Sequence, residues 1–218
     1  MENAGIEKEQ TIKLIKDFQE VLVPLMKIFG VSTNNRDLKQ FVWEFFNRFY
    51  SNLVSLENCL ILKDSLSTTL IQRYNHEMLL SFFFVVASPE AEKRVLDYFS
   101  YEEDLKNNPG KRTWSTEDKK ELRNHVPPWN AREPALSLFY KQLSDLAHPN
   151  CISMRLNRRG VKYEYIIMQS AVAMSIFEIC NCILYKPFRD IFEKENFDFT
   201  KCCLTIRNFQ SRCYSLLK

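Results

Sequence analysis

Apolar residues recur every three or four positions along most of this chain, and that spacing is typical of amphipathic helices. The first such stretch runs from Ile6 to Phe29 and stops at Gly30, a residue type that commonly ends helices. The second runs from about Arg36 to Ser51, and its apolar face is a broad aromatic stripe, which is more typical of a core than of a ligand site. The third covers about Ser55 to Val86 without a proline, so the pattern allows one long helix or two.

The rest of the chain combines helical spacing with one long polar stretch. Ser88-Pro89-Glu90 predicts the start of a new helix, because serine is a good cap and proline is tolerated in the first turn. Residues 101–131 are charged and interrupted by prolines, so we expect a polar surface connection with one short helix after Ser115. Helical spacing then returns at residues 133–147, about 162–185, 186–194 and 199–217.

The stretch 162–185 is apolar on nearly every side, which suits either a central buried helix or a membrane span. Glu164, Gln169, Glu178 and Asn181 interrupt it, so we favour the buried helix and expect no membrane. No alternating strand pattern and no internal repeat competes with the helices. The sequence therefore predicts a single all-α domain over residues 1–218, a bundle of about seven or eight helices with this one near its centre.

Composition excludes several classes of site. The 218 residues include only 4 glycines, each isolated, so neither a dinucleotide-binding glycine loop nor a P-loop can form. A net charge of +3 is too small to imply nucleic acid unless basic residues gather on one face. The 7 cysteines form no C-x-x-C motif and the 3 histidines are far apart, so we expect no metal and no cofactor, with a carboxylate-bound metal ion as the alternative that the sequence leaves open. Without a recognisable targeting segment, we expect a cytoplasmic protein with reduced cysteines.

The most informative feature is a pair of opposite charges, Arg73 and Glu77, four residues apart in the third helical stretch. Counting in steps of three and four from Leu66 and Leu70 places both charges on the face that should be buried. A buried charge is costly unless it is paired or a cleft opens to it. The two residues are therefore either a structural ion pair that sets helix register or part of a functional site.

A second polar row consists of Tyr140, Ser144 and His148, which are spaced by four residues along the 133–147 stretch and its end. His148 comes just before Pro149 at the C-terminus of the expected helix, where the helix dipole favours the protonated imidazole. It is a candidate acid or base near neutral pH. The structural alternative is a histidine that caps its own helix and hydrogen-bonds to a neighbour.

The loop after His148 is basic. Arginine forks match phosphate oxygens, so this loop is a candidate phosphate-binding segment, although a basic turn is also commonly just a solvated surface. Its four cationic residues are Arg155, Arg158, Arg159 and Lys162.

Together these segments resemble a known family. Leu70–Glu77, Ser88-Pro89-Glu90 and Phe139–Pro149 look like a family of uncharacterised bacterial helical proteins with an R-x-x-x-E helix and a Y-x-x-x-S-x-x-x-H-P helix. The resemblance spans about residues 60–185. That family is in turn similar to the HEPN superfamily, helical bundles that often act as ribonucleases in toxin and antiviral defence systems. The resemblance implies that the two motif helices converge, bringing together Arg73, Glu77, Tyr140, Ser144 and His148.

The chain departs from the usual HEPN ribonuclease motif, R-x4-6-H on one helix. No arginine lies five to seven residues before a histidine, and Lys141 is the nearest match before His148. Either Arg73 supplies the cation from a different helix or the ribonuclease chemistry is absent.

Two functional hypotheses follow. In the first, the protein is a metal-independent endoribonuclease of a defence or toxin system, with His148 as acid or base and Arg73 on the phosphate. In the second, it is a non-catalytic helical module that binds a protein partner or a nucleotide, and the polar cluster is structural. The aromatic stripe from Trp43 to Phe49 also suggests a homodimer face, because it is richer than one core needs.

Overall fold

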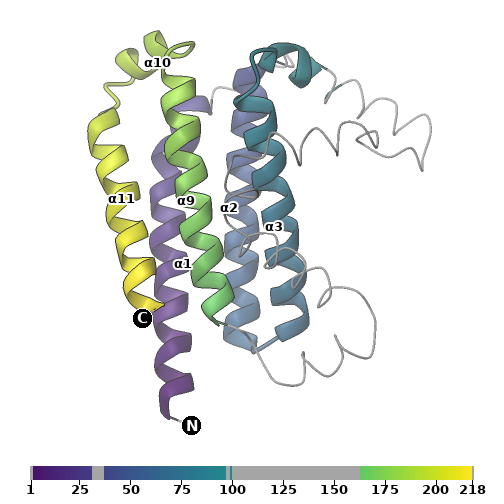
Figure 1. Cartoon of the computed structure of the whole chain (residues 1–218), viewed down its shortest axis with the longest axis vertical. Coiled ribbons are helices and arrows are strands. Elements are labelled where there is room, and N and C mark those ends of the chain that lie inside the picture. The colour runs from purple at the N-terminus through teal and green to yellow at the C-terminus, as the bar shows by residue number, and fades with distance from the viewer. Residues whose placement is uncertain (1, 31–36, 97–98, 100–162, 218) are drawn as a thin grey trace, which may run out of the picture.

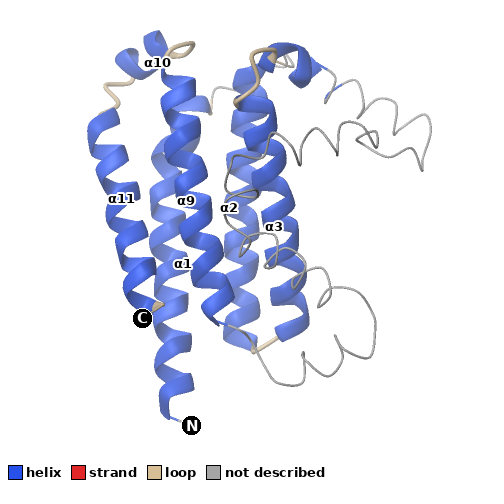
Figure 2. Cartoon of the chain, in the orientation of Figure 1, coloured by secondary structure: helices blue, strands red, loops and turns tan. Residues whose placement is uncertain are grey.

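The described residues of the computed structural model, 2–30, 37–96, 99 and 163–217, form helices joined by short connections, and this part of the chain contains no strand (Figure 2). Six helices and a further helical stretch at residues 91–96 make seven, which confirms the all-α prediction. The six helices are α1 (Glu2–Phe29), α2 (Leu38–Leu62), α3 (Ser65–Val86), α9 (Tyr163–Tyr185), α10 (Arg189–Lys194) and α11 (Phe199–Leu216).

The five long helices lie side by side with their axes roughly aligned, and the short α10 crosses one end (Figure 1). Helices α1 and α2 are antiparallel neighbours, and α3 turns back along α2. Helix α9 packs against α1, α3 and α11, while α11 also contacts α1. The predicted central position of the 162–185 helix is therefore confirmed for the described part of the bundle.

The boundary between the second and third helices differs from the prediction. Helix α2 continues through residues 51–55, where the hydroxyls of Ser51 and Ser55 donate to the carbonyl oxygens four residues earlier, each at 3.0 Å. The chain breaks instead at Lys63, whose φ of 58° is in the left-handed region that ends many helices. Asp64 then caps α3 by accepting a hydrogen bond from the Ser67 amide at 3.0 Å.

Other predicted boundaries agree with the structure. Helix α1 ends before Gly30, and the hydroxyl of Ser88 accepts a hydrogen bond from the Glu90 amide at 3.1 Å, just before the helical stretch at 91–96. The ranges 186–194 and 199–217 correspond to α10 and α11. The expected polar connection at 101–131 and the expected helix at 133–147 lie outside the described residues.

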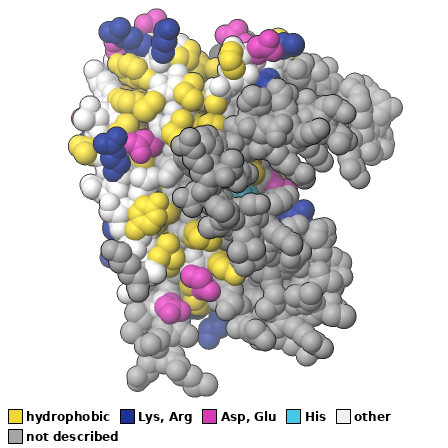
Figure 3. Space-filling view, in the orientation of Figure 1, with side chains coloured by type: hydrophobic (Ala, Val, Ile, Leu, Met, Phe, Trp, Pro, Cys, Tyr) yellow, Lys and Arg dark blue, Asp and Glu magenta, His cyan; other side chains and the backbone are white. Residues whose placement is uncertain are grey.

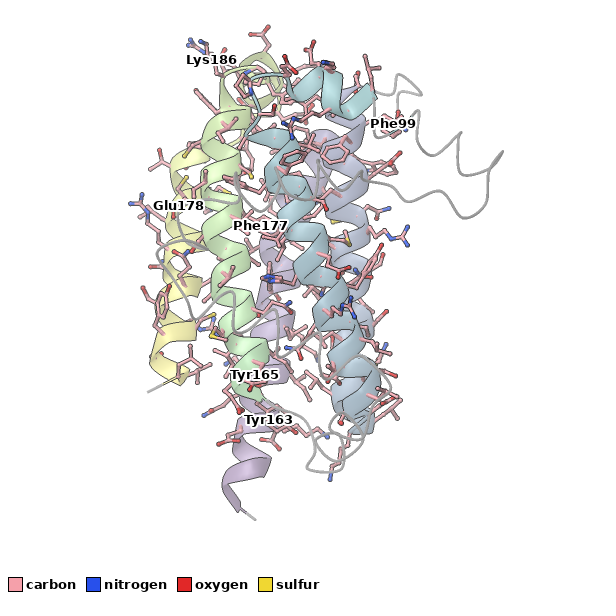
Figure 4. The ribbon with its side chains drawn as sticks, turned by 45° about the vertical axis from the view of Figure 1, so that its right-hand side comes forward. Phe99, Tyr163, Tyr165, Phe177, Glu178 and Lys186 are labelled. Carbon is pink, nitrogen blue, oxygen red and sulfur yellow. The ribbon has the colours of Figure 1, made fainter. Side chains whose placement is uncertain are left out.

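An aromatic cluster occupies the centre of the core (Figure 4). Phe177 on α9 is fully buried, and five phenylalanine rings surround it with centroid distances of 5.5–6.4 Å. These rings come from three helices: Phe18 on α1, Phe45, Phe46 and Phe49 on α2, and Phe82 on α3. Most of the aromatic stripe of α2 is thus used inside this chain, so the stripe no longer argues for a homodimer face.

Helix α9 is long and apolar enough to cross a membrane by length and composition. In the structure most of its side chains are buried in the bundle, where it contacts α1, α3 and α11. Charged side chains gather at the end of the bundle that carries α10 (Figure 3).

Replacement of Phe177 by alanine tests the role of this cluster. We expect Phe177→Ala to lower the free energy of unfolding by about 3–5 kcal/mol, because a large buried ring is lost and its neighbours collapse only in part. Urea unfolding followed by circular dichroism measures the change. Phe199→Ala, at the partly exposed start of α11, is the control. An equal loss in both variants would contradict the central role of Phe177.

Candidate functional site

Two of the predicted site residues lie in the described part of the chain. Arg73 and Glu77 are both on α3. The other predicted catalytic residues, Tyr140, Ser144 and His148, lie outside the described residues, as do the predicted phosphate-binding residues Arg155, Arg158, Arg159 and Lys162. The convergence of the two motif helices therefore stays a prediction.

Arg73 and Glu77 form an ion pair within α3. The Nε atom of Arg73 lies 3.1 Å from Oε1 of Glu77, in the i, i+4 arrangement. Their side chains are 27% and 44% exposed, so neither is in the core. The expectation that both charges lie on a buried face is wrong.

Arg73 and Glu77 are not buried because the first half of α3 turns other residues toward the core than the apolar spacing predicts. Leu66, Leu70 and Tyr74 are 49%, 44% and 40% exposed. The inward face is set instead by Leu79 and Phe82, which are fully buried. Steps of three and four back from Leu79 reach the buried residues His76, Asn75, Gln72, Thr69 and Thr68.

The inner face of α3 is therefore polar from Thr68 to His76, and at Gln72 it meets Gln169 of α9. We call this set the buried polar seam: Thr68, Thr69, Gln72, Asn75 and His76 on α3, with Gln169 and Ser170 on α9. A pattern search based on apolar residues misses it. The sequence feature that could have revealed the seam is the apolar stretch at the end of α3. Counting back from that stretch in steps of three and four residues leads to these polar positions.

Hydrogen bonds satisfy much of the buried polar seam. The side-chain amide of Gln169 donates to the backbone carbonyl oxygen of Gln72 at 2.5 Å, and so joins α9 to α3. The amide of Asn52 on α2 donates to Oδ1 of Asn75 at 2.7 Å. The hydroxyl of Thr68 donates to the backbone oxygen of Asp64 at 2.6 Å. These bonds offset the desolvation cost of burying polar groups and link three helices.

Three buried polar atoms lack a hydrogen-bond partner in the described part of the chain. They are Nε2 of Gln72 and both polar side-chain atoms of Asn181 on α9. An unsatisfied buried polar atom costs about 1–3 kcal/mol.

His76 is next to Glu77 in sequence but differs from it in environment. Its side chain is 3% exposed, and burial lowers the pKa of His76 from 6.5 to about 4, because the charged imidazole is poorly solvated there. His76 is consequently neutral at pH 7. The structure thus places this histidine in the core as a packing residue.

The position of Arg73 is compatible with binding of an anion. No group of three or more histidine, cysteine, aspartate or glutamate side chains within the described ranges is arranged to hold a metal ion. Arg73 is partly exposed and is oriented by Glu77. An arginine has five N–H donors, so engagement of Nε by a carboxylate leaves donors for a second anion.

Comparisons with known proteins add no family. The scan against protein-family models gave no match, and the searches of curated proteins and of solved structures gave none either. The similarity to the HEPN superfamily therefore stays an inference from the motifs in the sequence.

The buried His76 predicts a specific pH dependence of stability. Its pKa in the folded chain is below the ordinary value, so the unfolded chain binds the proton more readily. Stability from neutral His76 is complete above pH 6.5 and is lost as the pH falls towards 4, by about 3 kcal/mol in total.

Urea unfolding at several pH values between 7 and 4 tests this expectation. His76→Gln, which cannot take up the proton, should show a flatter decline in stability over this range than the wild type. Glu77→Gln should decline as the wild type does. Parallel curves for His76→Gln and the wild type would rule out the assignment.

Proposed function

We propose that this protein is a HEPN-like helical protein that binds RNA through phosphate contacts and cleaves it without a metal ion, in an antiviral defence or toxin system. One observation carries the proposal: Arg73 is held at the surface of α3 by Glu77 instead of being sequestered in the core. The Nε–Oε1 bond of 3.1 Å limits the orientation of the guanidinium group. An oriented and partly exposed guanidinium is suited to binding a phosphate oxygen pair.

The exposure of the pair weighs against a purely structural role. A register lock acts through burial, since breaking a buried pair leaves an uncompensated charge and costs 3–5 kcal/mol. An i, i+4 pair exposed to solvent is worth only about 0.3–0.5 kcal/mol. With side chains 27% and 44% exposed, Arg73 and Glu77 are partly buried but not enclosed in the core, so they are nearer to the second class. Arg73 thus contributes little to folding, which favours a role in binding a ligand.

In the proposed mechanism Arg73 neutralises the charge that develops on the scissile phosphate, and Glu77 orients Arg73. His148 removes the proton of the attacking 2′-hydroxyl or returns a proton to the leaving oxygen, as a group that titrates near neutral pH can do. Tyr140 and Ser144 position the RNA backbone. The basic loop would add phosphate contacts through Arg155, Arg158, Arg159 and Lys162. His76 takes no part in proton transfer, because it is buried and has a low pKa.

Thermal melts distinguish a binding role of the Arg73–Glu77 pair from a structural one. We expect Arg73→Ala, Glu77→Ala and the double variant each to lie within about 0.5 kcal/mol of the wild type, because an exposed pair contributes little. Arg189→Ala removes the same kind of i, i+4 pair on α10 and is the matched control. Losses of several kcal/mol in each single variant, with recovery in the double variant, would support the structural alternative.

Cleavage and binding of single-stranded RNA test the activity itself. We expect cleavage by the wild-type chain to survive a chelator, and His148→Ala to abolish it while the circular dichroism spectrum stays unchanged. Arg73→Ala should weaken RNA binding by about tenfold or more, because a phosphate contact is lost. Arg189→Ala should behave as the wild type in both assays.

The outcomes separate the two hypotheses. Equal cleavage by the wild type and His148→Ala would overturn the proposed mechanism. RNA binding that depends on Arg73 without any cleavage would identify a non-catalytic binding module. Cleavage lost on chelation would indicate a carboxylate-bound metal ion instead of the histidine route.

A further inference from the structure

Helices α9 and α11 run antiparallel and pair in a constant register (Figure 1). Three contacts define it: Gln210 donates to Ser175 at 2.6 Å, Arg207 pairs with Glu178 at 2.6 Å, and the rings of Tyr185 and Phe199 lie 4.9 Å apart. The three residues from Ser175 to Glu178 are matched by three back from Gln210 to Arg207, and the seven from Glu178 to Tyr185 by eight from Arg207 to Phe199. Figure 4 marks the position of Glu178 on α9.

The same register places Cys182 opposite Cys203. Cys182 is four residues after Glu178, and Cys203 is four residues before Arg207, so the two cysteines form the next pair along the interface. Cys182 contributes to the raised pKa of the Cys203 thiol, as expected for two side chains that lie close together. Cys182 is exposed and Cys203 is partly buried, so the pair is open to solvent from one side.

We propose that Cys182 and Cys203 are a redox-active pair that forms a reversible disulfide between α9 and α11 on reaction with a hydroperoxide. The register of α9 against α11 places the two cysteines opposite each other, and proximity of the two thiols is the main geometric requirement for a bridge. The proposal is independent of the RNA-binding function, because the pair lies on helices other than α3.

The chemistry balances with hydrogen peroxide as the oxidant. The Cys182 thiolate attacks one peroxide oxygen, the O–O bond breaks, and a sulfenic acid forms with release of hydroxide, which takes up a proton to give water. The Cys203 sulfur then attacks the sulfenic sulfur, the S–S bond forms, and a second water leaves. Two thiols and one hydrogen peroxide thus become one disulfide and two waters, and a dithiol reductant reverses the reaction.

The environments of the two cysteines predict the order in which they react with peroxide. Cys182 is exposed and is therefore the thiol that a peroxide reaches first. Burial, with added contributions from Cys182 and Glu178, raises the pKa of the Cys203 thiol. Cys203 is accordingly the less accessible thiol, and it acts second by resolving the sulfenic acid formed at Cys182.

The disulfide would attach α11, a long helix that buries few of its side chains. Helix α11 buries only Ile206, Phe209 and Cys213, and its other attachments include the exposed Arg207–Glu178 and Arg212–Asp17 pairs. Exposed ion pairs add little stability. A covalent link at Cys203 would fix the first turns of α11 to α9, and it would close a loop of about 20 residues that contains α10.

The test uses the full chain, reduced and then treated with hydrogen peroxide. Remaining thiols are alkylated and peptides are mapped by mass spectrometry. We expect a peptide pair linked through Cys182 and Cys203, its loss after treatment with dithiothreitol, and a rise in Tm of roughly 5–10 °C in the oxidised chain.

Three variants complete the experiment. Cys182→Ser and Cys203→Ser should each abolish the linked peptides and the rise in Tm, whereas Cys59→Ser, which alters a partly exposed thiol on α2, should retain both. Circular dichroism checks that each variant is folded. Separate alkylation of Cys182 and Cys203 after peroxide treatment, or linkage of either to another cysteine or to a second chain, would overturn the proposal.

Discussion

The contact of Phe177 with aromatic rings from three other helices is the constraint on which the bundle depends. A fully buried ring at this position requires α1, α2 and α3 to present their phenylalanines to the same point. Because interiors are close-packed, each of these helices then has one rotational setting. For α3 that setting turns Phe82 and Leu79 inward. With Phe82 and Leu79 turned inward, the polar residues of the first half of α3 also face the core.

The buried polar seam adds specificity to this packing. A core made only of apolar side chains tolerates small slips between helices, whereas a slip between α3 and α9 would break the bond from Gln169 to Gln72. The bond from Asn52 to Asn75 sets the register of α2 against α3 in the same way. The apolar cluster therefore supplies most of the burial, and the polar seam determines which turns of the helices meet.

The same rotation of α3 also determines where its charged residues Arg73 and Glu77 lie. Once the polar seam is inside, Arg73 and Glu77 lie at the edge of the helix, paired and open to solvent. A guanidinium in that position adds little to folding and is free to meet an anion. The proposed phosphate contact rests on this position of Arg73 beside Glu77. The cysteines between α9 and α11 lie in a different helix pair, so oxidation there is chemically independent of the Arg73 surface.

Local patterns in the sequence determined the all-helical class, the central apolar helix α9, and the ends at Gly30 and Ser88, because caps and apolar spacing act within a few residues. They misplaced the break between α2 and α3 and the inward face of α3. Ser51 and Ser55 are compatible with either a helix or a break, and only the packing of α2 kept them helical. Likewise, the apolar residues of α3 fit two faces, and tertiary contact at Phe82 decided which face is buried, since burial depends on neighbours distant in the chain.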